Sequence, residues 1–321
     1  MYNIGIDTSC YTTSLAVLDA NGQLVIDSRK FLKVKTGERG LRQSDGLFQH
    51  IVNLEKIVSQ LDFAKGKIKS VTASKKPRNE DGSYMPVFRG GSLAGSFLAA
   101  GSNGKYYELS HQEGHLFSAL WSLRDLVKLE ELDIFMFFHI SGGTTELLLA
   151  ERQNDVGYKL TKIGGSTDLN GGQFIDRVGV ASGLDFPCGS EMDQLLQKFL
   201  LDSKVVKKIN LRITIKDSEF SFSGPETQAV RLLEGGEEKE HIFKSVFDSI
   251  EKAVGVAVTN ASKEHGINKI IISGGVAANS FIRDGLTKRL SKEKIDVLFP
   301  DVKYASDNAV GNAYFGFLMG I

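Results

Sequence analysis

Apolar residues recur along the chain at two spacings, which predict strands and helices in turn. Residues 3–34 hold three apolar segments separated by turns of small or polar residues, and they predict three strands. The segment 44–61 has apolar residues at helical spacing after a Ser-Asp start, so it predicts a helix. A short strand at 68–74 and a polar loop at 75–86 follow it.

The rest of the chain continues this alternation of patterns. Further strands are predicted at 133–140, 144–151, 157–164 and 269–275, the last of which enters a glycine turn. Further helices are predicted at 90–101, 111–129, 171–184, 189–201, 242–265, 278–292 and 306–320. Strands that alternate with helices in this way indicate the α/β class.

The two halves of the chain show a weak internal repeat. The segments "NIGIDTSCYTTSLAVLD" (3–19) and "FMFFHISGGTTELLLAE" (135–151) each consist of an apolar strand, a tight turn of small residues and a second apolar strand. Two related halves fit a duplicated α/β domain with a cleft between the copies. We therefore expect a first lobe at 1–130, to which the last helix (306–321) returns, and a second lobe at 131–305.

Composition narrows the classes of function without choosing one. The 321 residues include 39 basic and 39 acidic side chains, so the formal net charge is zero, which argues against a protein that simply coats nucleic acid. Two cysteines, Cys10 and Cys188, are too few for a disulfide scaffold. The first residues already read as a strand and no apolar run approaches a membrane span, so we expect a cytoplasmic protein without a membrane segment.

Three turns of small residues are candidate phosphate or nucleotide sites, because such turns expose several backbone N–H groups at one point. The first turn contains Thr8, Ser9 and Cys10, and the second is "SGGTT" (141–145). The third, "SGGVAAN" (273–279), joins a buried strand to a helix, and its Asn279 could contact a nucleotide or simply cap that helix. The Walker and Rossmann glycine patterns are both absent from the sequence.

A pair of histidines, His111 and His115, lies four residues apart on a predicted helix. Residues at this spacing share a helix face, so the two imidazoles could bind one metal ion. A metalloprotease would need Glu directly after the first histidine, but Gln112 stands there and Glu113 comes one residue later. Two partly exposed histidines without a ligand remain an equal alternative on spacing alone.

Six motifs of the chain stand in the order and spacing found in one known family. They are "GIDTSC" (5–10), "HQEGH" (111–115), "SGG" (141–143), "FSFSG" (220–224), "SGGVAAN" (273–279) and "SDNAVGNAY" (306–314). In these motifs, which extend over nearly the whole chain, the sequence resembles the tRNA threonylcarbamoyladenosine transferase family. The resemblance implies the two-lobed fold of the actin-like, Hsp70 and sugar-kinase superfamily, made of duplicated RNase H-like domains.

The resemblance also implies cofactors, a reaction and site residues. It implies an iron or zinc ion held by His111, His115 and Asp307, although Asp307 could instead be the N-cap of the last helix. It implies a threonylcarbamoyl-adenylate bound against the metal, transfer to the exocyclic amine of a tRNA adenosine, and protein partner subunits. Together with Gly274 and Gly275 of the third turn, the predicted nucleotide-binding residues are His139, Ile140, Ser141, Gly142, Gly143, Asp176, Gly189 and Asn279.

The chain departs from the family pattern on the side where the reaction takes place. The family has E-T-S-C-D-E at the first turn, whereas this chain has Asp7 in place of Glu, and Tyr11 and Thr12 in place of the two later carboxylates. One of those carboxylates is thought to assist transfer in the family, and no residue of this chain can be named in its role. A long polar loop also replaces a short tight one before the helix at 90–101.

Two functions remain open at this point. The first is metal-dependent transfer of a threonylcarbamoyl or related acyl group from an adenylate to an acceptor amine, such as that of a tRNA adenosine. The second is a non-catalytic or regulatory nucleotide-binding subunit that partners other proteins. A sugar-kinase reaction is disfavoured because its acidic base is missing, and a protease because the histidine motif does not match. The altered first turn predicts that transfer to tRNA is weak or absent.

Overall fold

The computed structural model describes residues 1–9, 11–34, 41–59, 67–202 and 205–320. The chain forms two compact units. Unit 1 comprises Met1–Glu131, Arg152–Tyr158 and Asp307–Ile321, and unit 2 comprises Leu132–Glu151 and Lys159–Ser306. The three predicted metal ligands lie in unit 1. The predicted nucleotide-binding residues, which run from His139 to Asn279, lie in unit 2.

Unit 1 is built on a five-stranded sheet in the order β3-β2-β1-β4-β5. Its strands are β1 (Tyr2–Asp7), β2 (Thr12–Leu18), β3 (Leu24–Phe31), β4 (Ile68–Lys76) and β5 (Lys105–Ser110). The first three strands pair antiparallel, and β4 and β5 run parallel to β1. Buried aliphatic side chains of β1, β2 and β4 form a hydrophobic core on this sheet. Because such a core is close-packed, it holds the residues at the ends of the strands in place.

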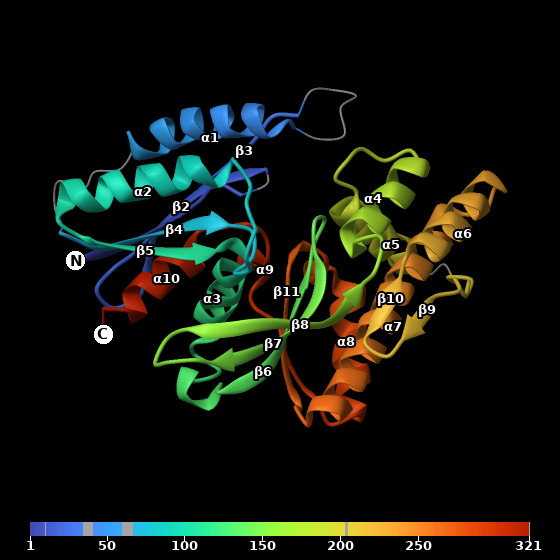
Figure 1. The fold of residues 1–321 in the computed structure, drawn as a ribbon. Helices are drawn as coiled ribbons and strands as arrows, with labels where there is room; N and C mark the ends of the chain where they lie inside the picture. Colours follow the sequence, from blue (N-terminus) through green and yellow to red (C-terminus); the bar gives the residue numbers. More distant parts are fainter. Residues whose placement is uncertain (10, 35–40, 60–66, 203–204, 321) are drawn as a thin grey trace. The chain divides into compact units, whose positions relative to one another are not determined.

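Helices cover both faces of this sheet. They are α1 (Gln43–Val58), α2 (Phe88–Ser102), α3 (His111–Leu123) and α10 (Val310–Leu318), with a short 3₁₀ turn, η2, at Leu129–Glu131. Figure 1 shows α1 and α2 on one face and α3 and α10 on the other. Gly5 lets α10 lie directly on β1, because a Cβ at this position would lie 2.1 Å from the Ala309 carbonyl oxygen.

Unit 2 contains a seven-stranded sheet in the order β12-β11-β6-β7-β8-β10-β9. Its strands are β6 (Ile134–Ile140), β7 (Thr145–Arg152), β8 (Tyr158–Ser166), β9 (Thr214–Lys216), β10 (Glu219–Ser221), β11 (Lys269–Ser273) and β12 (Asp296–Leu298). The order β8-β7-β6-β11-β12 repeats β3-β2-β1-β4-β5 of unit 1. This repeat confirms the duplication that the sequence predicted.

A long central helix organises the rest of unit 2. The helices are α4 (Gly171–Ala181), α5 (Gly189–Leu201), α6 (Ser223–Glu234), α7 (Lys239–His265), α8 (Ser280–Lys292) and α9 (Val302–Ala305), with the 3₁₀ turn η3 at Gly275–Ala278. The helix α7 packs against α4, α5, α6 and α8. It buries an almost continuous apolar stripe that includes Phe243, Phe247 and Val254.

The "FSFSG" motif acquires a structural role in unit 2. Asp168 accepts hydrogen bonds from the Ser221 hydroxyl (2.5 Å), the Phe222 N–H (2.9 Å) and the Ser223 N–H (3.3 Å), at the point where α6 begins. Burial raises the pKa of Asp168, but these hydrogen bonds outweigh burial and hold the pKa below its usual value. The motif therefore fixes the start of α6 to the end of β8.

Candidate metal centre and nucleotide-binding turns

The two histidines stand on the first turns of α3, and a capping box fixes where that helix begins. Ser110 is the N-cap: its hydroxyl oxygen accepts from the Glu113 N–H (3.2 Å), and the Glu113 carboxylate accepts from the Ser110 N–H (2.7 Å). Glu113 thus has its carboxylate at the helix start. The protease alternative loses its base, because the only glutamate of the motif is a capping residue.

A close crossing of α3 and α10 brings Asp307 to the histidines. A Cβ at Gly311 would lie 2.0 Å from the Gly114 carbonyl oxygen, so the two helix backbones touch there. The Asn308 side chain accepts from the Ser118 hydroxyl (3.0 Å) and from the Val310 N–H (2.9 Å), which ties the start of α10 to α3. Asp307 is therefore not the N-cap of α10, whose N-cap position is Ala309.

The donor atoms of His111, His115 and Asp307 all lie within 4.8 Å of one another. The two Nε2 atoms are 3.1 Å apart, and Asp307 Oδ1 is 3.3 Å from His115 Nε2 and 3.7 Å from His111 Nε2. Two ligands bound at about 2.0–2.1 Å to a tetrahedral ion are separated by roughly 3.3 Å. Two imidazoles and one carboxylate are also a common donor set for zinc or iron, so these residues fit such an ion.

A second carboxylate, that of Asp7, contacts His111 at the ring nitrogen that is not next to His115. Asp7, at the end of β1, is 2% exposed, and its Oδ2 lies 2.7 Å from His111 Nδ1. Burial lowers the pKa of His111, but the carboxylates of Asp7 and Asp307 outweigh burial and raise the pKa to about 9. Burial and the neighbouring His111 lower the pKa of His115. A divalent cation that displaces the proton from His111 would face two neutral imidazoles and the two carboxylates, whose negative charge it balances.

The first turn directs its polar groups into unit 1. Thr8 and Ser9 are fully buried; the Thr8 hydroxyl donates to the Val87 carbonyl (2.9 Å), and the Ser9 N–H donates to Asp7 Oδ1 (2.7 Å). We therefore leave Thr8 and Ser9 out of the proposed nucleotide site, since a phosphate would have to displace these contacts. Cys10, the third residue predicted for this turn, lies outside the described residues.

The polar loop before α2 lies against the start of α3. The Gln112 N–H donates to the Pro77 carbonyl (3.1 Å), and the Phe88 ring centroid is 6.1 Å from that of His111. Tyr84 in this loop is 59% exposed, and the Arg89 guanidinium lies 5.6 Å from its ring centroid. The loop that is longer and more polar than its counterpart in the family pattern therefore borders the predicted metal ligands.

In unit 2, the second and third turns meet at the ends of β6 and β11. Ser273 pairs with His139 in the parallel ladder, and a Cβ at Gly274 would lie 2.1 Å from the Ile140 carbonyl oxygen. The Gly172 N–H donates to the Ser141 carbonyl (3.1 Å), which adds the start of α4 to the group. His139 and Ile140 are buried strand residues. Cβ atoms at Gly142, Gly143 or Gly275 would meet no atom within 4 Å, so open space borders these turns.

Asp176, Gly189 and Asn279 lie on neighbouring helices of unit 2. Asp176 Oδ1 accepts from the Cys188 N–H (2.8 Å) at the start of α5, and burial raises the pKa of Asp176. Asn279 caps α8 by accepting from the Ile282 N–H (3.0 Å), while its buried Nδ2 contacts no acceptor among the described residues. The sequence left capping and ligand binding as alternatives for Asn279. The cap is present, and the amide N–H₂ remains as a donor for a ligand.

Two acidic residues of these sites had no role in the sequence-based prediction. Asp7 contacts His111 although the two residues are far apart in sequence. Asp193 on α5 accepts from the Ser280 N–H (2.9 Å) and hydroxyl (2.9 Å), which holds the start of α8 beside α5. A signal for Asp7 was an acidic residue directly after the apolar segment 4–6 of β1. For Asp193 the sequence offers no such signal.

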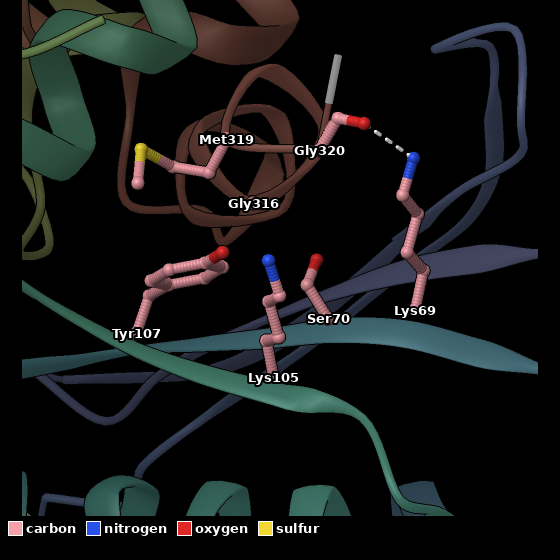
Figure 2. Close-up of a pocket in the computed structure, with 7 residues that line it drawn as sticks. All are labelled: Lys69, Ser70, Lys105, Tyr107, Gly316, Met319 and Gly320. Carbon is pink, nitrogen blue, oxygen red and sulfur yellow. Dashed lines mark hydrogen bonds between the residues drawn. The ribbon is translucent and has the colours of Figure 1, made fainter.

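Two surface hollows lie elsewhere. One, of about 300 Å³, is bordered by β4, β5 and the last turn of α10 (Figure 2). Within it the Lys69 ammonium donates to the Gly320 carbonyl (2.6 Å), so this lysine caps the helix end. The other, of about 450 Å³, borders β8, β9 and β10. Neither contains a predicted site residue.

Among the residues that the structure describes, no helix has both the length and the apolar character needed to cross a membrane.

Comparison with known proteins adds to this geometry. Residues 49–314 match the family model described as tRNA N6-adenosine threonylcarbamoyltransferase. Relatives with that name include a Clostridium kluyveri protein, 30% identical over 335 residues that cover 99% of this chain and 93% of the relative. Another, from Kosmotoga olearia, is 27% identical over 316 residues and covers 95% of this chain and 89% of its own length.

Solved structures resemble the chain in fold. Component A of (R)-2-hydroxyglutaryl-CoA dehydratase from Acidaminococcus fermentans has a TM-score of 0.56 at 15% identity, with 99% of this chain and 98% of that one covered. A ROK family glucokinase from Streptomyces griseus has a TM-score of 0.52 at 12% identity, with 98% of each chain covered. The predicted fold of the actin-like, Hsp70 and sugar-kinase superfamily is confirmed.

Proposed function

Because this chain belongs to the tRNA N6-adenosine threonylcarbamoyltransferase family, we propose that it transfers a threonylcarbamoyl or related acyl group from an adenylate to an acceptor amine. The relatives' name describes the acceptor as N6 of a tRNA adenosine, and we propose the same acceptor here. The observation that supports this most is the cluster of His111, His115 and Asp307, whose spacing suits one divalent cation.

In this proposal the three side chains hold one iron or zinc ion. Such an ion would act as a Lewis acid toward an oxygen atom of the acyl-adenylate. His111 and His115 contribute imidazole nitrogens from one helix face, and Asp307 contributes a carboxylate that is 27% exposed. Because Asp307 is the most exposed of the three, the side of the cluster next to it is the open one, where a ligand can approach.

The turns of unit 2 would bind the adenylate. Gly142, Gly143 and Gly275 leave open space beside backbone, which suits the close approach of a nucleotide. The Asn279 amide offers a donor to the sugar or base, and Asp176 offers a carboxylate near the start of α5. We include His139, Ile140, Ser141, Gly189 and Gly274 in this proposed site, the last because its glycine lets β11 and β6 end side by side.

One observation favours the second function, a nucleotide-binding subunit that partners other proteins. Tyr11 and Thr12 stand where the family pattern has carboxylates, so the first turn offers hydroxyl groups in place of a base. Tyr11 is 43% exposed, whereas Thr12 is 4% exposed in β2. The metal cluster and the open turns do not depend on these positions. Slow transfer with intact ligand binding would agree with the missing carboxylates and also with the retained metal cluster and open turns.

Replacing Asn279 with serine should weaken adenine-nucleotide binding without removing the helix cap. Serine is a good N-cap, so α8 keeps its first hydrogen bond, while the amide donor is lost. We expect a loss of about 1–3 kcal/mol in binding free energy, the scale for leaving a buried partner unpaired. Isothermal calorimetry with ATP measures it, with Ser291→Ala near the end of α8 as the control. Equal affinities for both variants would remove Asn279 from the site.

The proposed function can be examined on the protein as isolated. We expect native mass spectrometry of the chain, purified without a chelator, to show one divalent metal per chain and a bound adenine nucleotide or adenylate. Protein bearing His115→Ala should lack the metal and keep the nucleotide, because the predicted nucleotide residues lie in unit 2. A wild-type chain that carries neither ligand after incubation with zinc and ATP would contradict the proposal.

A further inference from the structure

Asp7 is a buried acid outside the set of metal ligands. It ends β1, opposite Ser14 of β2, and only 2% of its surface is exposed. A carboxylate removed from water in this way is costly unless both of its oxygen atoms are paired. Oδ1 accepts from the Ser9 N–H (2.7 Å), and Oδ2 lies 2.7 Å from His111 Nδ1.

This pairing determines which nitrogen of His111 faces the cluster. An ionised carboxylate can only accept, so Nδ1 of His111 must carry the hydrogen that joins it to Asp7. The lone pair of a neutral ring is then on Nε2. That atom lies 3.1 Å from His115 Nε2 and 3.7 Å from Asp307 Oδ1, on the side where the three donor atoms converge.

The position of Asp7 is itself fixed by the sheet. The strand β1 lies between β2 and β4, and α10 packs directly on it at Gly5. The Ser9 N–H restrains Oδ1, so rotation of the carboxyl group would break a buried hydrogen bond. A histidine ligand held by a carboxylate on its other nitrogen is the arrangement that tunes and orients metal sites.

We propose that Asp7 is a positioning residue, which fixes the tautomer and ring orientation of His111 so that Nε2 is presented to a divalent cation. The inference rests on the proposed metal cluster and adds to it a residue that does not touch the ion. It also gives a role to a position at which this chain has Asp where the family pattern has Glu.

The test is Asp7→Asn, which preserves shape and alters hydrogen bonding. The Asn oxygen should keep the Ser9 N–H, which turns the amide N–H₂ toward His111. Nδ1 then becomes the acceptor and the hydrogen moves to Nε2, where it blocks the cation. We expect zinc affinity, measured by competition with a chromophoric chelator, to fall about 10–100-fold at unchanged stoichiometry.

Three comparisons separate the outcomes. If wild type binds zinc and His115→Ala does not, but Asp7→Asn equals wild type, the role of Asp7 is overturned and the metal site stands. If wild type shows no zinc binding that depends on His115, the proposed function itself fails. Long-range ¹H–¹⁵N spectra of zinc-loaded wild type should show the proton of His111 on Nδ1; a proton on Nε2 overturns the inference even where Asp7→Asn does not fold.

Discussion

Replacing His115 with alanine should abolish high-affinity binding of a divalent cation. His115 Nε2 lies 3.1 Å from the other imidazole and 3.3 Å from Asp307, so it is the donor atom closest to both partners. Loss of an outer partner of a metal ligand typically weakens affinity about 10–100-fold, so loss of the ligand itself should cost at least about 100-fold. Equilibrium dialysis against zinc, followed by elemental analysis, measures the change.

The controls for this prediction separate metal binding from folding. His265→Ala removes an exposed histidine at the end of α7 and should bind zinc as wild type does. His115→Gln keeps most of the buried side-chain volume and should lose affinity as the alanine variant does. Thermal unfolding without metal checks that each variant folds. Zinc bound by His115→Ala with wild-type affinity and stoichiometry would show that the cluster is not the site.

The second large effect concerns the first turn. The family pattern has a carboxylate at position 11, and removal of a general base typically slows a reaction about 10²–10⁴-fold. We therefore expect wild-type transfer to tRNA to be slower than that of the relatives by a factor on this scale. Tyr11→Asp should raise the rate at least about tenfold, since Tyr11 is exposed enough to accept a charge. Thr12 is a poor choice, because a carboxylate there would be buried in β2.

The matched control is Tyr11→Asn, which has the shape of aspartate without its charge. If the gain comes from a base, only Tyr11→Asp accelerates transfer. If both variants accelerate it equally, the tyrosine acted by obstructing the acceptor, and the argument from the missing carboxylate is wrong. The measurement is the amount of threonylcarbamoyladenosine formed on unmodified tRNA, quantified after nuclease digestion.

Much of the fold could be predicted because burial follows the hydrophobic pattern. The helices 189–201 and 278–292 and the strand 133–140 agree with α5, α8 and β6 within about two residues. The strand β5 was missed, because it is short and runs directly into α3 at Ser110. The helix predicted to reach residue 129 stops at Leu123, whose carbonyl accepts from both the Leu126 and Val127 N–H groups.

Other differences depend on contacts between distant parts of the chain. The helix α6 was missed because its start is held by Asp168 rather than by a local cap. The last helix begins at Val310, not 306, because the Asn308 side chain accepts the Val310 N–H. Strands of three residues, such as β12, carry too little pattern to be recognised.

Prediction of the candidate metal site from the sequence is limited in the same way, by contacts between distant parts of the chain. The histidine pair is visible in the sequence, because helical spacing alone places both rings on one face. Asp307 came only from the resemblance, since no local pattern distinguishes a ligand from a capping residue. Asp7 came from neither, because its contact with His111 depends on how β1 and α3 pack in unit 1.

The most direct test of the account is a single-turnover assay with preformed threonylcarbamoyl-adenylate and unmodified tRNA, using excess metal-loaded chain. We predict slow formation of threonylcarbamoyladenosine that disappears when zinc or iron is removed, returns when it is added back, and is absent with His115→Ala. Equal amounts of modified adenosine from wild type and His115→Ala would contradict metal-dependent transfer at this site. The absence of modified adenosine with both the metal-loaded wild type and the metal-loaded Tyr11→Asp variant would contradict it as well.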